Sequence, residues 1–130
     1  MASDVKIDPT VLILDDNFDI VELISLAIED MGGVNTLIET DPWRALKLAK
    51  GKRLAAIFID YNIPSLNGGE FFKMLSTFDY VPPVCFVTGF SADIPNDILS
   101  HNKVKVIQKP FKDSDIQNVL SHFIEDKNAA

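Results

Sequence analysis

The chain has 130 residues, 47% apolar and 24% charged, which suits one globular domain with a sizeable core. Its 12 basic and 19 acidic residues give a net charge of −7, which argues against a nucleic-acid-binding surface. The single cysteine, Cys85, excludes an internal disulfide and a cysteine-based zinc site. No apolar segment approaches the ~20 residues that span a bilayer, and residues 1–8 lack a signal-peptide pattern, so we expect a cytoplasmic protein without membrane contact.

Apolar runs alternate with stretches of helical period from the start of the chain. Residues 11–14 are the first expected strand, and residues 20–31 repeat apolar side chains at three- and four-residue intervals, as on one face of a helix. Residues 34–38 are a weaker strand candidate. Asp41, followed by a proline, predicts the N-cap of a second helix that ends at Gly51.

The middle of the chain repeats this pattern. Residues 55–59 form an apolar run that ends in Asp60, and residues 62–69 contain the proline, glycines and asparagines of a loop. Residues 71–78 carry a third apolar helical face. A pair of prolines then leads into residues 84–87, the fourth expected strand.

The last third is expected to hold a short helix, a strand and a longer helix. The segment 91–102 is short and contains Pro95, so we predict a short helix that begins near this proline. Residues 104–107 are the fifth expected strand. Asp113 predicts the cap of a final helix whose apolar positions continue to residue 124.

Five strand–helix units indicate an α/β fold. The strands are apolar throughout, which is typical of a parallel sheet with helices on both faces. In such sheets ligands bind beyond the carboxyl ends of the strands.

Polar residues occupy these ends. Asp15 and Asp16 follow the first strand, Asp60 the third, Thr88 the fourth and Lys109 the fifth. We therefore expect them to lie together. Two carboxylates ~4 Å apart repel by on the order of 4 kcal/mol at an effective dielectric of about 20. A divalent cation with oxygen ligands, such as Mg²⁺, relieves this repulsion, and Lys109 adds positive charge.

This combination suits phosphoryl transfer. An aspartate carboxylate can act as the nucleophile, while a cation and a lysine neutralise charge on the phosphoryl oxygens. Each residue alone has a structural alternative: Asp15 and Asp16 could cap the following helix, and Asp60 could begin a turn. Thr88 and Lys109 could be structural or solvated. Their common placement at one sheet edge favours the functional interpretation.

The motifs around these residues resemble the receiver domain of two-component response regulators. The resemblance covers about residues 10–126, so we expect one domain over 10–126 with short flexible tails at 1–9 and 127–130. It implies a flavodoxin-like, doubly wound fold with five helices and a five-stranded parallel sheet in the order 2-1-3-4-5. The matching stretches are Leu14-Asp15-Asp16, Asp60-Tyr61-Asn62-Ile63-Pro64 with Gly68, Val87-Thr88-Gly89 and Lys109-Pro110-Phe111.

The resemblance also implies a role for each site residue. Asp60 is expected to be the phosphoacceptor, Thr88 the switch hydroxyl and Lys109 the partner of the phosphoryl group. A cis peptide bond is expected between Lys109 and Pro110. Asp15 is expected to act mostly through a metal-bound water. The expected ligands of the cofactor Mg²⁺ are Asp15, Asp16, Asp60 and the backbone carbonyl of Asn62.

A receiver domain catalyses only its own phosphorylation and dephosphorylation, so the resemblance implies a phosphoacceptor signalling domain and not a conventional enzyme. The expected phosphoryl donors are a sensor histidine kinase or a histidine phosphotransfer protein. Phosphorylation of Asp60 would then switch the interaction with an output partner, which the sequence does not identify, in phosphorelay signal transduction. We expect no direct contact of this domain with nucleic acid.

Three features depart from the family pattern. The position three residues before Lys109 is often Tyr or Phe in the family, with a ring that swings inward, and here it is Val106. Phe90, two residues after Thr88, is a large side chain near the site, and we hypothesise that it partly shields the acyl phosphate from water. The segment 91–102 is short for the fourth helix of the family.

Two other functions are consistent with parts of the pattern. A phosphatase of the haloacid-dehalogenase type also uses an aspartate nucleophile with Mg²⁺, but its Asp-x-Asp motif follows the first strand, and here Asn62 is not an acid. A passive interaction module would keep the fold without the switch, and the complete set of polar residues argues against it. Hydrolysis of a phosphomonoester would distinguish the first alternative, and failure to accept a phosphoryl group the second.

Overall fold

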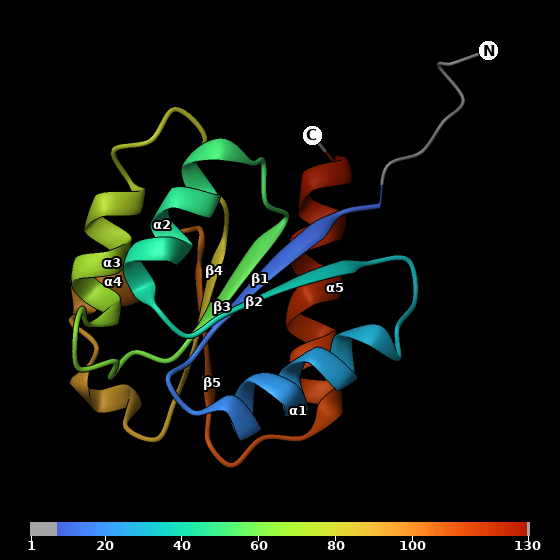
Figure 1. Cartoon of the computed structure of the whole chain (residues 1–130), viewed down its shortest axis with the longest axis horizontal. Helices are drawn as coiled ribbons and strands as arrows, with labels where there is room; N and C mark the ends of the chain where they lie inside the picture. The colour runs from blue at the N-terminus through green and yellow to red at the C-terminus, as the bar shows by residue number, and fades with distance from the viewer. Residues whose placement is uncertain (1–7, 130) are drawn as a thin grey trace.

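The structure, a computed structural model, describes residues 8–129, so most of the expected tail at 1–9 lies outside the described part. Five parallel strands form one sheet with the spatial order β2-β1-β3-β4-β5 (Figure 1). This order confirms the doubly wound, flavodoxin-like fold implied by the resemblance. The strands are β1 (Thr10–Leu14), β2 (Asn35–Glu39), β3 (Ala56–Ile59), β4 (Val84–Thr88) and β5 (Val104–Gln108).

Helices cover both faces of the sheet (Figure 1). One face carries α1 (Phe18–Glu29) and α5 (Asp113–Ala129), and the other carries α2 (Pro42–Gly51), α3 (Gly68–Leu75) and α4 (Asn96–Leu99). Each face has its own apolar core. Strands β3 and β4 are buried along their whole length between these cores, which explains why their sequences are apolar at every position before the terminal threonine.

Side-chain caps fix where the first three helices begin. Asn17 caps α1, because its side-chain oxygen accepts the N–H of Asp19, so the alternative in which Asp15 or Asp16 caps this helix is wrong. Asp41 caps α2 as predicted. Asn67 caps α3. The two aspartates after β1 are therefore free for another role.

The connection from β4 to β5 contains little helix, as the sequence predicts. A short 3-10 helix, η2 (Ser91–Asp93), precedes Pro95, and α4 is a single turn of four residues. Asp113, predicted as a cap, is itself the first residue of α5. This helix continues to Ala129, beyond the expected domain end at residue 126.

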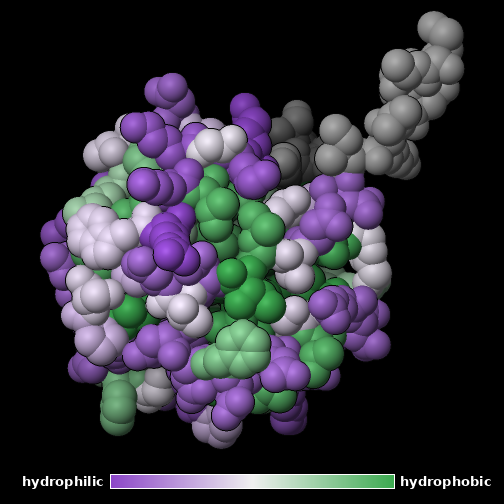
Figure 2. Space-filling model, in the orientation of Figure 1, coloured by the Kyte–Doolittle hydropathy of each residue, from purple (hydrophilic) through white to green (hydrophobic). Residues whose placement is uncertain are grey.

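Strand β2 forms one edge of the sheet, and Figure 2 shows apolar residues gathered over it between α1 and α2. Ile38 on this strand is 42% exposed. Before β2, Gly32 and Gly33 both adopt positive φ angles of 74° and 72°, which favour glycine and end the preceding helix. Among the described residues, no helix is both long and apolar enough to cross a membrane.

Candidate functional site

Three carboxylates converge at the carboxyl ends of β1 and β3. Asp15 and Asp16 follow β1, Asp60 follows β3, and one oxygen from each side chain lies within 4.8 Å of the other two. Parallel pairing brings the strands together here, since the backbone N–H of Asp60 donates to the carbonyl of Leu14 at 3.1 Å. Asp15 is buried, Asp60 is partly buried and Asp16 is exposed. The predicted cluster is therefore present, and it opens to solvent on one side.

Lys109 supplies the positive charge beside these carboxylates. Its Nζ atom lies 3.3 Å from Oδ2 of Asp15 and 3.6 Å from Oδ2 of Asp60. Its backbone N–H donates to the carbonyl of Thr88 at 2.8 Å, and the peptide bond to Pro110 is cis, as expected. The lysine thus holds two of the three carboxylates at once.

The electrostatics of Asp15 reflect its burial. Removal from water raises the pKa of the Asp15 carboxyl above its ordinary value, and the negative charge of Asp60 raises it further. The backbone N–H of Asn17, which donates to Asp15 at 2.9 Å, and the ammonium of Lys109 act in the opposite direction. Burial dominates, so the net effect is a raised pKa for Asp15, and more positive charge at the site would favour its ionised form.

Thr88 ends β4 with its side chain fully buried. Its Oγ1 atom accepts the backbone N–H of Phe90 at 3.2 Å and the side-chain amide of Asn62 at 3.5 Å. Asn62 in turn donates its backbone N–H to Oδ1 of Asp60 at 3.2 Å. Asp60 therefore begins a turn, which was the structural role considered for it as an alternative. This turn positions Asn62 between the carboxylate of Asp60 and the hydroxyl of Thr88.

All five residues predicted at the sheet edge thus lie around one site. The two unusual positions, Phe90 and Val106, differ in exposure. Phe90 donates its backbone N–H to Thr88, and the residue as a whole is 69% exposed. Val106 is partly buried. Two contacts were not predicted from the sequence. The side-chain amide of Asn62 contacts Thr88, and the side-chain amide of Gln108 donates to the carbonyl of Gly89 at 2.6 Å. The position of Asn62 two residues after an aspartate is the one available signal for its contact.

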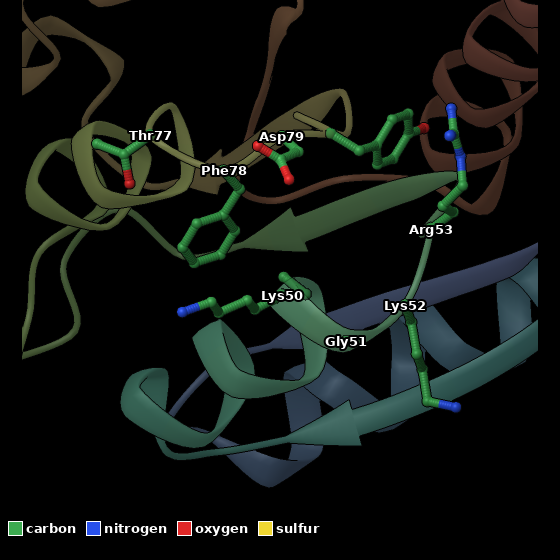
Figure 3. A pocket seen from close by; sticks show the side chains of 9 residues that line it. Lys50, Gly51, Lys52, Arg53, Thr77, Phe78 and Asp79 are labelled. Carbon is green, nitrogen blue, oxygen red and sulfur yellow. The ribbon is translucent and has the colours of Figure 1, made fainter.

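A separate hollow of about 400 Å³ lies at the opposite end of the sheet, between the end of α2 and the residues that follow α3 (Figure 3). The guanidinium of Arg53 lies 4.3 Å from the centroid of the Tyr80 ring. Figure 3 shows the amines of Lys50 and Lys52 pointing in different directions. These cations do not converge on a common point, and we assign the hollow no role.

Comparison with known proteins decides the family. The family model described as the response regulator receiver domain matches residues 11–121, which is most of the chain. The chain belongs to this family. It is therefore a receiver domain of the two-component signalling systems. None of the curated proteins matches it.

Solved structures of other receiver domains share the fold of this one. The receiver domain of the sensor histidine kinase PA1611 from Pseudomonas aeruginosa PAO1 is similar with a TM-score of 0.80, at 20% identity over 92% of this chain and 99% of that one. The chemotaxis response regulator CheY4 of Vibrio cholerae gives 0.76 at 24% identity over 90% and 99%. The receiver domain of the Francisella response regulator 1452 gives 0.77 at 22% identity over 92% and 98%. The Pseudomonas structure holds a magnesium ion in its active-site cleft.

The donor set of this receiver domain fits a hard divalent cation. Asp15, Asp16 and Asp60 offer only oxygen atoms, which hard cations prefer. Neither histidine nor cysteine belongs to the cluster, so soft or imidazole-seeking metals have no preferred ligand there. The exposed side of the cluster leaves room for water to complete the coordination of such an ion.

Proposed function

We propose that this receiver domain accepts a phosphoryl group on Asp60 from a phosphohistidine, with Mg²⁺ as cofactor, and so switches its interaction with an output partner. The observation that carries the proposal is the pairing of Lys109 with both Asp15 and Asp60 beside a third carboxylate. An aspartate held next to a fixed cation and a hydroxyl is arranged for phosphoryl transfer, which requires positioning and charge neutralisation above all.

In the transfer step a carboxylate oxygen of Asp60 attacks phosphorus. A P–O bond forms while the P–N bond to the histidine breaks, and the electron pair stays on the imidazole nitrogen, which takes a proton from solvent. The product is an acyl phosphate on Asp60 and a neutral histidine on the donor. Asp60 is suited to attack because it is only partly buried, so its carboxylate remains accessible to a donor.

Lys109 and Thr88 act on the transferred group. The ammonium of Lys109 already lies 3.6 Å from Asp60 and would pair with a phosphoryl oxygen after transfer. Thr88 would turn its hydroxyl from its present partners, Phe90 and Asn62, to donate to another phosphoryl oxygen. The movement of Thr88 is the event that converts phosphorylation into a structural change.

Mg²⁺, when bound, would supply positive charge to the phosphoryl oxygens and offset the repulsion among the carboxylates. Asp15, Asp16, Asp60 and the backbone carbonyl of Asn62 would hold it, with Asp15 acting mostly through water. The raised pKa of Asp15 agrees with a site that needs further positive charge. The magnesium ion in the Pseudomonas receiver domain supports the same assignment.

The donor would be a sensor histidine kinase or a histidine phosphotransfer protein, because a receiver domain takes its phosphoryl group from histidine. Apart from catalysing its own phosphorylation and dephosphorylation, the domain would have no enzymatic activity. It would act in the cytoplasm, without direct contact with nucleic acid or membrane. Its output partner would recognise the phosphorylated form.

The proposal is tested by intact-mass spectrometry after incubation with acetyl phosphate and Mg²⁺. The parent protein should gain the mass of one phosphoryl group, and neither Asp60→Asn nor the parent in EDTA should gain it. Asp19→Asn is the matched control, because it removes an exposed carboxylate of α1 outside the cluster and should leave the gain intact.

This experiment and a phosphatase assay together separate the alternatives. A parent protein that gains no mass, while it remains folded and Mg²⁺ is present, would make the chain a passive module. Steady hydrolysis of p-nitrophenyl phosphate that depends on Asp60 would instead indicate a phosphatase.

A further inference from the structure

Tyr61 lies between the proposed phosphorylation site and the helices α3 and α4, which cover one face of the sheet. It directly follows Asp60, and its side chain belongs to the core that packs under α2, α3 and α4. Its ring meets the ring of Phe86 edge to face, with centroids 5.3 Å apart and an interplanar angle of 79°. Two aromatic rings in this geometry attract each other beyond their apolar burial, so the position of Tyr61 depends on that of β4.

Two glycines at the start of α3, Gly68 and Gly69, lie against the side chain of Tyr61. A Cβ atom at Gly68 would lie 2.7 Å from both Cδ2 of Tyr61 and Cε1 of Phe86, closer than packed atoms approach. The backbone N–H of Gly68 also donates to the carbonyl of Tyr61 at 2.7 Å. The main chain of α3 therefore touches the tyrosine directly and leaves its ring little freedom to adopt another rotamer.

The hydroxyl end of Tyr61 lies near α4. A Cβ atom at Gly69 would lie 2.8 Å from the Tyr61 hydroxyl and 3.2 Å from Cδ1 of Ile98, so these two groups flank the same glycine. Ile98 is the residue of α4 that is buried in the core. Burial raises the pKa of the Tyr61 hydroxyl, and the negative charges of Asp97 and Asp93 raise it further, in keeping with a neutral hydroxyl that faces α4 and η2.

Strand β4 connects the same tyrosine to Thr88. Phe86 and Thr88 are two residues apart on a strand, so their side chains point to the same face of the sheet. The Thr88 hydroxyl also accepts the backbone N–H of Phe90, the residue that directly precedes η2. A displacement of Thr88 toward Asp60 would therefore act on Tyr61 through Phe86 while it releases the start of η2.

The position that usually reports such a displacement in this family offers no ring here. Val106 is β-branched, which restricts its χ1 angle, and it is too short to replace a tyrosine or phenylalanine that changes rotamer. Tyr61, by contrast, directly follows Asp60 in the chain, and its hydroxyl lies beside Gly69, as does Ile98 of α4.

We propose that Tyr61 is the positioning residue through which the state of Asp60 reaches α4 and η2, by the contact of its ring with Phe86 and by the place of its hydroxyl beside Gly69 and Ile98. This inference rests on the proposed function, because it needs Asp60 to be phosphorylated. The tyrosine takes no part in the chemistry of transfer. Its removal should therefore leave phosphorylation intact and abolish the structural response.

The test compares ¹H–¹⁵N amide spectra with and without beryllium fluoride and Mg²⁺, a mimic of the phosphoryl group on aspartate. The parent protein should show shift changes both around Asp60 and over residues 91–101. In Tyr61→Leu the changes around Asp60 should persist and those over 91–101 should be lost. The matched control is Val106→Ala, which truncates the usual reporter position and should respond as the parent does.

Gly69→Ala gives a second variant in case Tyr61→Leu does not fold. Its new Cβ would wedge between the Tyr61 hydroxyl and Ile98 while leaving the ring on Phe86, so the response over 91–101 should again be lost. Alanine also favours a helix over glycine, which offsets part of the strain.

A full response over 91–101 in either variant, or its loss in Val106→Ala, would overturn the inference. The mass gain with acetyl phosphate, measured on the same samples, distinguishes this failure from a failure of the proposed function. A variant that keeps the gain and the response contradicts the role of Tyr61 alone. A parent protein without the gain contradicts the proposed function, and the inference fails with it.

Discussion

The ammonium group of Lys109 lies 3.3 Å from the buried carboxylate of Asp15, and this pair joins residues that are 94 positions apart in the sequence. The contact connects the end of β5 to the end of β1 across the site. Because Lys109 pairs with only two of the three clustered carboxylates, the negative charge is only partly balanced. The metal-free receiver domain therefore carries an electrostatic cost at its site, as expected of residues placed there for function.

Asp15→Asn should stabilise the metal-free protein at pH 7, by about 1 kcal/mol, the usual scale of such gains. The folded-state pKa of Asp15 is raised above 3.8, so the folded protein binds a proton more readily than the unfolded chain, and stability falls as pH rises through this range. The advantage of Asp15→Asn should therefore shrink as pH falls toward 3.8. Urea unfolding in EDTA at several pH values measures it, and a variant less stable than the parent at pH 7 would refute the prediction.

Mg²⁺ should raise the midpoint of thermal unfolding of the parent protein, because binding to the folded state alone stabilises it. At a Mg²⁺ concentration of ten times Kd the expected gain is about 1.4 kcal/mol. Asp16→Asn removes an exposed carboxylate of the cluster and should lose most of the gain, whereas Asp19→Asn should keep it. Thermal unfolding with EDTA and with Mg²⁺ checks this, and equal gains in all three proteins would rule out the carboxylate site.

Gly68→Ala should destabilise the protein by roughly 1–3 kcal/mol, the usual cost of overpacking. The added Cβ would lie 2.7 Å from Phe86 and Tyr61 side-chain atoms and 3.0 Å from the Tyr61 Cα atom, so backbone as well as side chains must move. Gly51→Ala is the matched control, since nothing lies within 4 Å of its added Cβ and its φ is not positive. Chemical denaturation of both variants measures the difference, and equal stabilities would show that the packing around Gly68 is loose.

Phe90→Ala should lose its phosphoryl group faster than the parent, by about threefold, or roughly 0.7 kcal/mol of barrier. Phe90 is 69% exposed in this structure, so shielding requires its ring to turn over the site when Thr88 releases the Phe90 N–H. Leu99→Ala, which truncates an exposed apolar residue of α4, should leave the rate unchanged. The rate is followed as loss of the phosphorylated mass, and a rate equal to or slower than that of the parent contradicts the shielding hypothesis.

The sequence was sufficient to predict the fold and the gathering of residues at one sheet edge. Apolar runs that each end in a polar residue carry that information, because parallel strands place their carboxyl ends together. The cap of α1 was less predictable, since Asp15, Asp16 and Asn17 are all good caps and only the path of the chain selects Asn17.

Contacts that depend on side-chain direction in loops also escaped prediction. The amide of Asn62 reaches Thr88 only because the turn after β3 directs it there. The role of Tyr61 could not be read from the sequence either, because it depends on the clearance at Gly68 and Gly69. The pattern of apolar residues along the sequence indicates where strands and helices lie. It does not indicate how closely the atoms of a loop approach those of a helix.

The central claim, that Asp60 is the phosphoacceptor, is tested most directly by trapping and mapping the modified residue. The protein is treated with acetyl phosphate and Mg²⁺, reduced with borohydride, which converts an aspartyl phosphate to homoserine, and digested for peptide sequencing by mass spectrometry. We predict homoserine at position 60 and at no other aspartate. Homoserine at Asp15 or Asp16, or its absence from every peptide of a protein that has gained the phosphoryl mass, would contradict this account.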